Sequence, residues 1–226
     1  MRAADRWGSL GPVSGLVFAV SFLALFLAFF GPGELPGGAD DSQIAAYFRG
    51  RGPAGFLLMY SLVGLAGASL LWFSGCLRAS LRLLEPGHGG LSDVAYGGGL
   101  ASAVLFLLGG TALLAPFAVI INSTLTIDPS VYHLFDTLGF LTINVGLFGQ
   151  AVQVVATSVV ALRSGGLPVW FAWVGFLVAV ALVLNLLYFF GLFVWVAWVL
   201  LTCGLLLARG GKTASHASRA ATEVIS

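Results

Sequence analysis

The stretch that decides the fold is His133 to Leu162, which reads HLFDTLGFLTINVGLFGQAVQVVATSVVAL. It is long enough to cross a bilayer, because a spanning helix needs about 20 predominantly apolar residues. Unlike the other apolar stretches, it carries polar side chains along its length, at His133, Asp136, Thr137, Asn144, Gln150 and Gln153. Polar groups at membrane depth are costly unless they meet partners, so they face other helices or a cavity. We therefore expect this stretch to lie at the centre of a helix bundle.

The composition predicts that lipid is the solvent for most of the chain. Of the 226 residues, 59% are hydrophobic and only 8% are charged, whereas a soluble domain is about 25% charged. The expected fold class is all-α, a polytopic bundle of transmembrane helices. The net charge of +1 and the absence from the sequence of a basic patch with interleaved aromatic residues predict no nucleic-acid partner.

Six apolar segments predict six spans in a single membrane domain, residues 1–208. The predicted spans are about 13–30, 54–77, 92–122, 133–162, 168–187 and 192–208. The last two come from one apolar run that is about twice as long as a single crossing. We place the turn between them near Tyr188 to Gly191, because aromatic residues cluster at membrane interfaces. Residues 209–226 are polar and rich in Ala, Ser and Thr, and we expect a disordered cytoplasmic tail.

The longest polar loop, residues 31–53, is expected to hold a short helix at about 41–49. Asp40 and Gln43 have the spacing of a capping box at its start, and Ile44, Tyr47 and Phe48 share one face. That apolar face favours packing on the bilayer surface or on the rim of the bundle. The alternative is a lid over a pocket.

The positive charges predict the orientation. With six spans, one side of the membrane holds the N-terminus, the loops 76–91 and 163–166 and the tail, and the other side holds the 31–53 loop. Of the ten Lys and Arg residues, two lie in the 31–53 loop, Arg49 and Arg51. The other eight lie on the side of the termini: Arg2, Arg6, Arg78, Arg82, Arg163, Arg209, Lys212 and Arg219. Because Lys and Arg are enriched in cytoplasmic segments, both termini are predicted to be cytoplasmic, in a multi-pass protein of the plasma membrane.

Within the third span, Gly98 and Ser102 have the small-xxx-small spacing of a helix contact.

Several kinds of chemistry have no support in the sequence. No Asp, Glu, Lys or Arg lies near the middle of a predicted span, which argues against ion-coupled transport. His88, His133 and His216 cannot be paired inside the spans as haem ligands. The HExxH and GxSxG motifs are absent from the sequence. We therefore predict no catalytic residue, no metal site and no cofactor.

The candidate site is the polar face of the fourth span, with His133, Asp136, Asn144 and Gln150 as its principal residues. One interpretation is hydrogen bonding between helices, which is worth about 0.6 to 2 kcal/mol per bond. The other is a cavity for a small molecule or a lipid headgroup that opens outward near Asp136.

Three segments carry a resemblance to a known family: IAAYFRGRG at 44–52, LWFSGCLRASLR at 71–82 and RSGGLPVWFAWVGF at 163–176. From about residue 12 to 209 the chain resembles a family of uncharacterised six-span integral membrane proteins common in actinobacteria. The resemblance implies the fold and the membrane location, and it implies no activity and no catalytic residues.

Three functions stay open on the sequence alone. The first is a non-enzymatic membrane protein that binds a membrane-protein partner or a second copy of itself, or that acts in the envelope. The second is a small-molecule or lipid transporter or binding protein that uses the polar face of the fourth span. The third is a membrane enzyme that combines His133, Asp136 and the acidic residues of the 31–53 loop.

Overall fold

The computed structural model describes residues 3–31, 35, 39–85, 90–123, 127–184 and 190–223, and the side chains of these from residue 11 to residue 208. Every element in this part of the chain is a helix: α1 (Ala3–Phe30), α2 (Asp41–Arg82), α3 (Gly90–Asn122), α4 (Pro129–Ser164), α5 (Val169–Leu184) and α6 (Phe190–Glu223). The expected all-α class is confirmed for the described residues.

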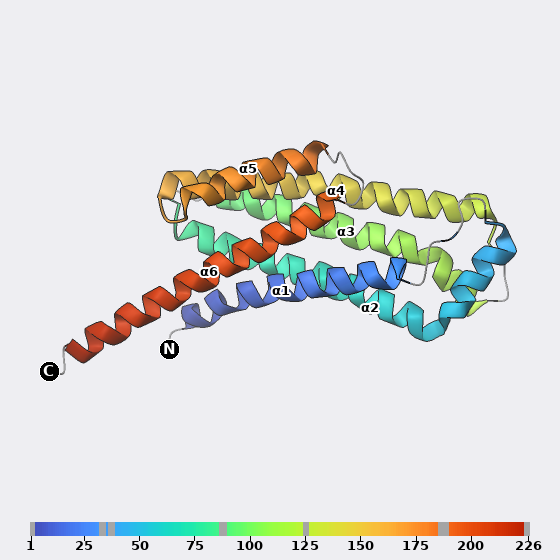
Figure 1. Ribbon diagram of the computed structural model, residues 1–226, viewed down its shortest axis with the longest axis horizontal. Coiled ribbons are helices and arrows are strands. Elements are labelled where there is room, and N and C mark those ends of the chain that lie inside the picture. Colours follow the sequence, from blue (N-terminus) through green and yellow to red (C-terminus); the bar gives the residue numbers. More distant parts are fainter. Residues whose placement is uncertain are drawn as a thin grey trace.

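The helices run alternately up and down an elongated bundle, and α1 begins at the end where α6 finishes (Figure 1). Each helix packs against the next one in the sequence, and α6 returns to pack against α1. The six helices therefore form a closed ring. We call the end where α2 meets α3 the hairpin end, and the opposite end, with residues 40–52, the loop-helix end.

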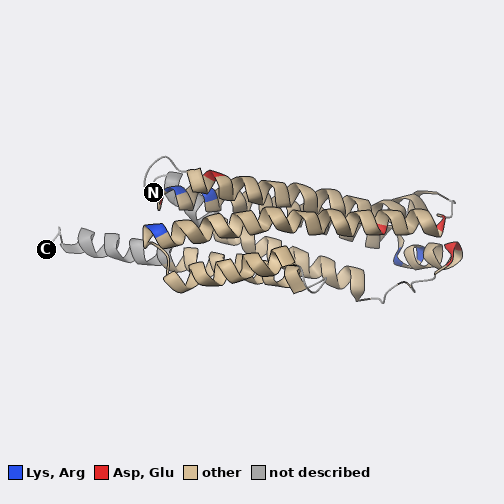
Figure 2. Ribbon diagram, turned by 90° about the horizontal axis from the view of Figure 1, so that it is seen from above, with Lys and Arg blue, Asp and Glu red and all other residues tan. Residues whose placement is uncertain are grey.

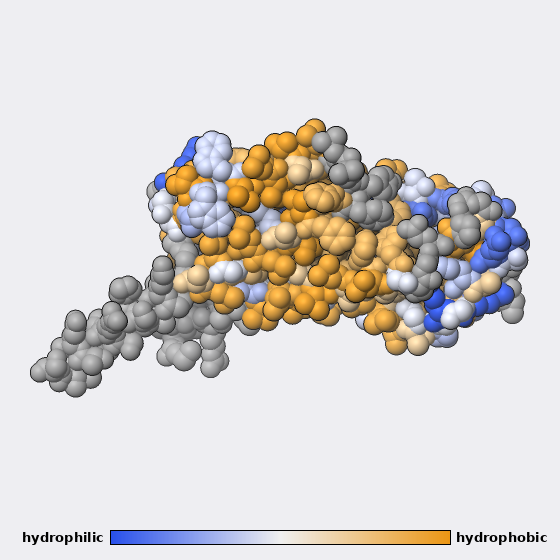
Figure 3. All heavy atoms as spheres, in the orientation of Figure 1, coloured by the Kyte–Doolittle hydropathy of each residue, from blue (hydrophilic) through white to orange (hydrophobic). Residues whose placement is uncertain are grey.

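The bundle has the surface of a membrane protein. Five helices are long and apolar enough to cross a bilayer: Gly11–Phe30, Asp41–Arg82, Gly90–Asn122, Pro129–Ser164 and Phe190–Ala208. Apolar side chains form a broad belt between two more polar ends (Figure 3). The charged residues of the described part lie at or near those ends (Figure 2).

Helix α5 covers the described part of the fifth predicted span, and α6 extends beyond the sixth. Helix α5 has 16 residues, about 24 Å at 1.5 Å per residue, which is less than the ~30 Å of a hydrocarbon core. The predicted turn near Tyr188 to Gly191 falls largely in 185–189, outside the described residues. Helix α6 continues past the predicted span end at Ala208 to Glu223, into the segment where we expected a disordered tail.

The predicted capping box starts α2. The Gln43 backbone amide donates to Asp40 Oδ1 (2.8 Å), and the Asp40 amide donates to Gln43 Oε1 (3.1 Å). The short helix ends at Gly52, whose φ of 63° lies in the left-handed region that favours glycine, and the chain then continues into the long part of α2. Phe48 is buried and packs against Phe117 of α3, so the apolar face of this short helix packs on the rim of the bundle.

Glycine residues bring α3 and α4 into close contact. A Cβ on Gly149 would lie 2.7 Å from the Gly98 carbonyl oxygen, and a Cβ on Gly139 would lie 2.8 Å from that of Gly109. No side chain larger than hydrogen fits at such distances, so these glycines let the two backbones touch. Gly98, one half of the predicted small-xxx-small pair, lies in this contact.

Aromatic side chains fill the seam where α6 meets α1. Phe18 of α1 and Trp195 of α6 are both buried, and their ring centroids are 4.9 Å apart. Phe22 and Phe106 contact the same indole. Aromatic pairs in this distance range add about 0.5–1.5 kcal/mol beyond the area they bury. This cluster holds the last helix against the first.

Candidate functional site

The structure spreads the four predicted site residues along α4. His133 is exposed, Asp136 and Asn144 are half-buried, and Gln150 is fully buried. Asp136 and Gln150 are separated by about 21 Å of helix rise. None of the four lines either of the two cavities described below. Their joint role as a binding face stays a prediction.

Two of these residues, Asn144 and Gln150, carry amide side chains: the first bonds within its own helix, and the second is unpaired among the described residues. The Asn144 side chain donates a 2.7 Å hydrogen bond to the Phe140 carbonyl one turn earlier in its own helix. Both amide atoms of Gln150 are buried without a hydrogen-bond partner among the described residues. An unpaired buried amide costs free energy, about 1–3 kcal/mol for each unsatisfied group in mutational studies.

A second glutamine, Gln153, does link helices. Its Nε2 donates a 3.1 Å hydrogen bond to the hydroxyl of Ser74 in α2, and both side chains are fully buried. A Cβ on Gly99 of α3 would overlap both of these atoms. Because Gly99 has no side chain, the Gln153 side chain of α4 can pass α3 and reach Ser74 in α2. The sequence named Gln153 as polar but contained no signal for its partner, because Ser74 lies in an otherwise apolar run.

At the loop-helix end, Arg51 fastens the short helix to α1. Its guanidinium donates 3.0 Å hydrogen bonds to the carbonyls of Ala28 and Phe29 in the last turn of α1. It also donates to the Tyr47 hydroxyl and lies 4.2 Å over the Tyr47 ring. A cation at a helix C-terminus is favourable because the unpaired carbonyls there carry partial negative charge. Arg51 is thus engaged in structural contacts, as the C-terminal cap of α1.

The Tyr132 phenol connects this cluster to the predicted site. Its ring contacts that of Phe48 in the short helix and that of His133, the first of the predicted site residues. Among the described residues, no three His, Cys, Asp or Glu side chains come together as a possible metal site. The described residues at this end therefore form a set of packing contacts with one half-buried carboxylate.

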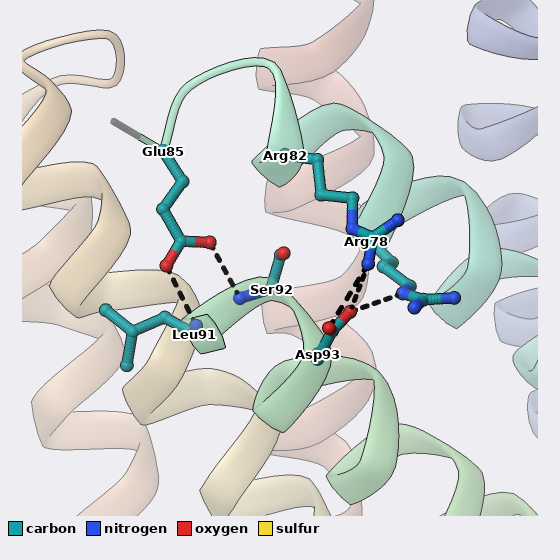
Figure 4. Close-up of polar contacts among 6 residues, drawn as sticks. All are labelled: Arg78, Arg82, Glu85, Leu91, Ser92 and Asp93. Atoms are coloured by element: carbon teal, nitrogen blue, oxygen red, sulfur yellow. Dashed lines mark hydrogen bonds and ion pairs between the residues drawn. The ribbon is translucent and has the colours of Figure 1, made fainter. Parts of the chain in front are cut away.

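At the hairpin end, two acidic residues join α2 to α3 (Figure 4). Asp93 pairs with Arg78 (2.7 Å) and with Arg82 (3.0 Å). The Glu85 carboxylate accepts hydrogen bonds from the backbone amides of Leu91 (2.8 Å) and Ser92 (3.0 Å). Amide groups at a helix start have no partner inside the helix, so Glu85 caps α3 and fixes the position of Leu91.

Leu91 lines an apolar groove of about 600 Å³ between α3, α4 and α5. We call it the lateral groove. Its walls consist of Leu91, Val94, Phe148, Ala151, Val152, Val155, Ala156, Val159, Phe176, Ala179, Val180, Val183 and Leu184, all of them apolar. Small-molecule sites usually have about 300–1,000 Å³, so the groove has the volume of a ligand site.

Local sequence explains why the groove is open. Gly175 lets α5 pack closely on α4 near the hairpin end, where a Cβ would overlap the Ser158 hydroxyl. Farther along, the facing positions Ala151, Ala156 and Ala179 carry side chains too short to fill the space between the helices. This site could not be recognised from the sequence, because its Ala and Val residues are the same types that face lipid elsewhere on a membrane helix.

A second cavity, of about 60 Å³, lies between α1, α3 and α4, with one lining residue each from α2 and α6. Its walls are apolar and mainly aromatic, including Phe22, Phe26, Phe106 and Phe140. This volume would hold only a few water molecules, and apolar cavities of such a size stay dry. It is too small for a drug-sized or lipid ligand, so the lateral groove is the candidate functional site.

Comparison with known proteins adds no assignment. A scan against protein-family models found no match, and searches of curated proteins and of solved structures found none either. The resemblance to the actinobacterial six-span family therefore stays a prediction.

Proposed function

We propose that this protein is a non-enzymatic, six-span protein of the plasma membrane that binds the acyl chain of a membrane lipid in the lateral groove. The observation that carries the proposal is the groove itself, about 600 Å³ with only apolar side chains on its walls among the described residues. Such a surface offers a ligand dispersion contacts and no polar recognition, which suits a hydrocarbon chain.

The orientation is part of the proposal. Among the described side chains, the hairpin end carries Arg78, Arg82 and Arg163 with Glu85 and Asp93, while the loop-helix end carries Arg49 and Arg51 with four acidic residues. In the whole sequence, eight of the ten Lys and Arg residues belong to the predicted side of the termini and of this hairpin, and two to the other, which supports a cytoplasmic hairpin end. The groove then opens toward the cytoplasmic half of the bilayer.

Photolabelling of the full-length protein tests the proposal. The protein is reconstituted into phosphatidylcholine vesicles that contain phosphatidylcholine with a diazirine on its acyl chain, and labelled peptides are mapped by mass spectrometry. We expect label on the α4 and α5 residues of the groove. Val152→Trp, which places a large ring in the groove at a position 45% exposed, is expected to reduce this label severalfold.

Val145→Trp is the matched control. Val145 is 53% exposed, lies on the same face of α4 two turns away from Val152, and is not among the groove residues. Equal labelling of the two variants, or label spread evenly over the apolar belt, would refute the proposal. A crosslinked dimer whose contact peptides are those of the groove would assign the groove to a second copy instead.

A further inference from the structure

The lateral groove has the depth of a single leaflet. Along α4 it extends from Phe148 to Val159, a rise of about 16 Å, whereas the whole hydrocarbon core is about 30 Å thick. Its α3 wall, Leu91 and Val94, belongs to the first turns of that helix, so the groove reaches the hairpin end. A lipid chain in it would come from the leaflet on that side, with its headgroup at the interface there.

The spacing of residues along α4 puts Arg163 next to this mouth of the groove. It follows Val159 by one turn of α4, so the two side chains share a face of the helix. Helical side chains lean toward the N-terminus and cover the preceding turn, which here is the turn that carries Val159. Arg163 is exposed, and it forms no ion pair with any side chain that the structure describes.

The other charges at this end are already engaged. Arg78 and Arg82 pair with Asp93, and Glu85 accepts hydrogen bonds from the backbone amides that begin α3. Figure 4 shows these two acidic groups turned toward α2 and the start of α3. Among the described side chains, Arg163 is therefore the positive charge at the groove mouth that has no carboxylate partner.

We propose that the lateral groove selects an anionic phospholipid of the cytoplasmic leaflet, with its acyl chain between α4 and α5 and its phosphate on Arg163. This inference rests on the proposed function. A guanidinium presents a planar fork of donors that matches phosphate oxygens. One basic residue near a membrane surface favours an anionic lipid by about fivefold.

Trp173 extends the apolar wall toward the same interface. It is 61% exposed, and its ring meets that of the groove residue Phe176 edge to face, with centroids 6.0 Å apart. Tryptophan favours the headgroup level of membranes. A lipid bound in the groove would thus lie between an aromatic anchor on α5 and a guanidinium on α4.

Competition for the photolabel tests the selection. The full-length protein is labelled with the diazirine phosphatidylcholine in vesicles where unlabelled phosphatidylglycerol or unlabelled phosphatidylcholine is the competitor, at equal mole fractions. For the wild type we expect phosphatidylglycerol to displace the groove label about fivefold better. In Arg163→Gln the two lipids should compete equally, while the groove is still labelled. Arg49→Gln, at an exposed position of the opposite end, should keep the wild-type preference.

The outcomes separate this inference from the proposed function. If Val152→Trp does not reduce labelling, the groove is not a lipid site and both fail. If the groove is labelled without a headgroup preference, or if Arg163→Gln retains the preference, only the selection by Arg163 is refuted. Should Arg163→Gln fail to fold, the competition is repeated with the wild type in high salt. Salt screens the attraction between exposed charges, so the preference for phosphatidylglycerol should weaken. A preference unchanged by salt would overturn the inference.

Discussion

The side chain of Gln153 in α4 donates a hydrogen bond to the Ser74 hydroxyl in α2, and this bond passes α3 at Gly99. Three helices are thereby joined at one buried level of the bundle. The contact depends on the absence of one methyl group, since a Cβ on Gly99 would occupy the place of both polar atoms.

Gly99→Ala is therefore expected to destabilise the protein. The added methyl must displace buried atoms, and overpacking of this kind costs about 1–3 kcal/mol. Gly97→Ala is the control from the same glycine run, because a Cβ there meets nothing within 4 Å and alanine favours a helix more than glycine does. Thermal unfolding in detergent should show a lower Tm for the first variant and an unchanged or higher Tm for the second. A similar Tm shift for both would contradict the close contact at Gly99.

Gln150→Met is expected to raise stability and to leave lipid labelling unchanged. The side chain keeps a similar length and loses a buried amide whose two polar atoms have no partner among the described residues, so about 1–3 kcal/mol of desolvation cost is removed. Thermal unfolding and groove photolabelling would be measured together. Loss of labelling in this variant would return the ligand site to the predicted polar face of α4.

Arg51→Gln is expected to loosen the short helix from α1. The substitution removes the charged donors that bind the carbonyls of Ala28 and Phe29, and hydrogen bonds to charged groups are worth about 1.5–3 kcal/mol. Hydrogen exchange should rise in residues 41–51 and at the end of α1. Arg49→Gln changes an exposed arginine two residues away and should exchange as the wild type does. If it matches Arg51→Gln instead, the cap is not what fastens the helix.

Acid should loosen the same short helix at its start. The Ser42 hydroxyl and the Gln43 backbone amide hold the pKa of the Asp40 carboxyl below its usual value. The cap is thus fully effective above about pH 3.9, the unfolded-state pKa of an aspartate, and its contribution is lost as the pH falls through the lower folded-state pKa. Hydrogen exchange in residues 41–51, corrected for intrinsic rates, should be unchanged down to about pH 4 and should accelerate as the pH falls further. Asp40→Asn keeps an acceptor oxygen that does not titrate, so a wild-type acceleration in that variant would exclude Asp40 as the cause.

Local patterns in the sequence predicted the elements of this fold. Asp40 and Gln43 fixed the start of α2, because a capping box is formed within four residues. Gly98 indicated a close helix contact, although only the structure shows that α4 is the partner and Gly149 the counterpart. Hydropathy located the apolar segments because a bilayer sets the length of a span.

Contacts between distant residues were beyond such patterns. Ser74 and Gln153 are 79 positions apart, and nothing in either neighbourhood indicates the other. The lateral groove is invisible in the sequence for the same reason: it arises from how α5 lies against α4, and its Ala and Val residues are typical of any lipid-facing surface. Residue types predicted a polar face on α4, but the burial of each residue depends on which neighbouring helix meets that turn.

The closed ring has a consequence for how the protein is made. During synthesis each helix from α2 to α6 can pack at once against the helix made before it. The contact between α1 and α6 is different, because these two helices are separated by four others in the sequence. The α1 face that buries Phe18 against Trp195 must wait for its partner until the last helix emerges from the ribosome. We therefore expect α1 to keep this aromatic face unpaired until α2 to α5 have been inserted, and the contact between α1 and α6 to form after the contacts among those four helices.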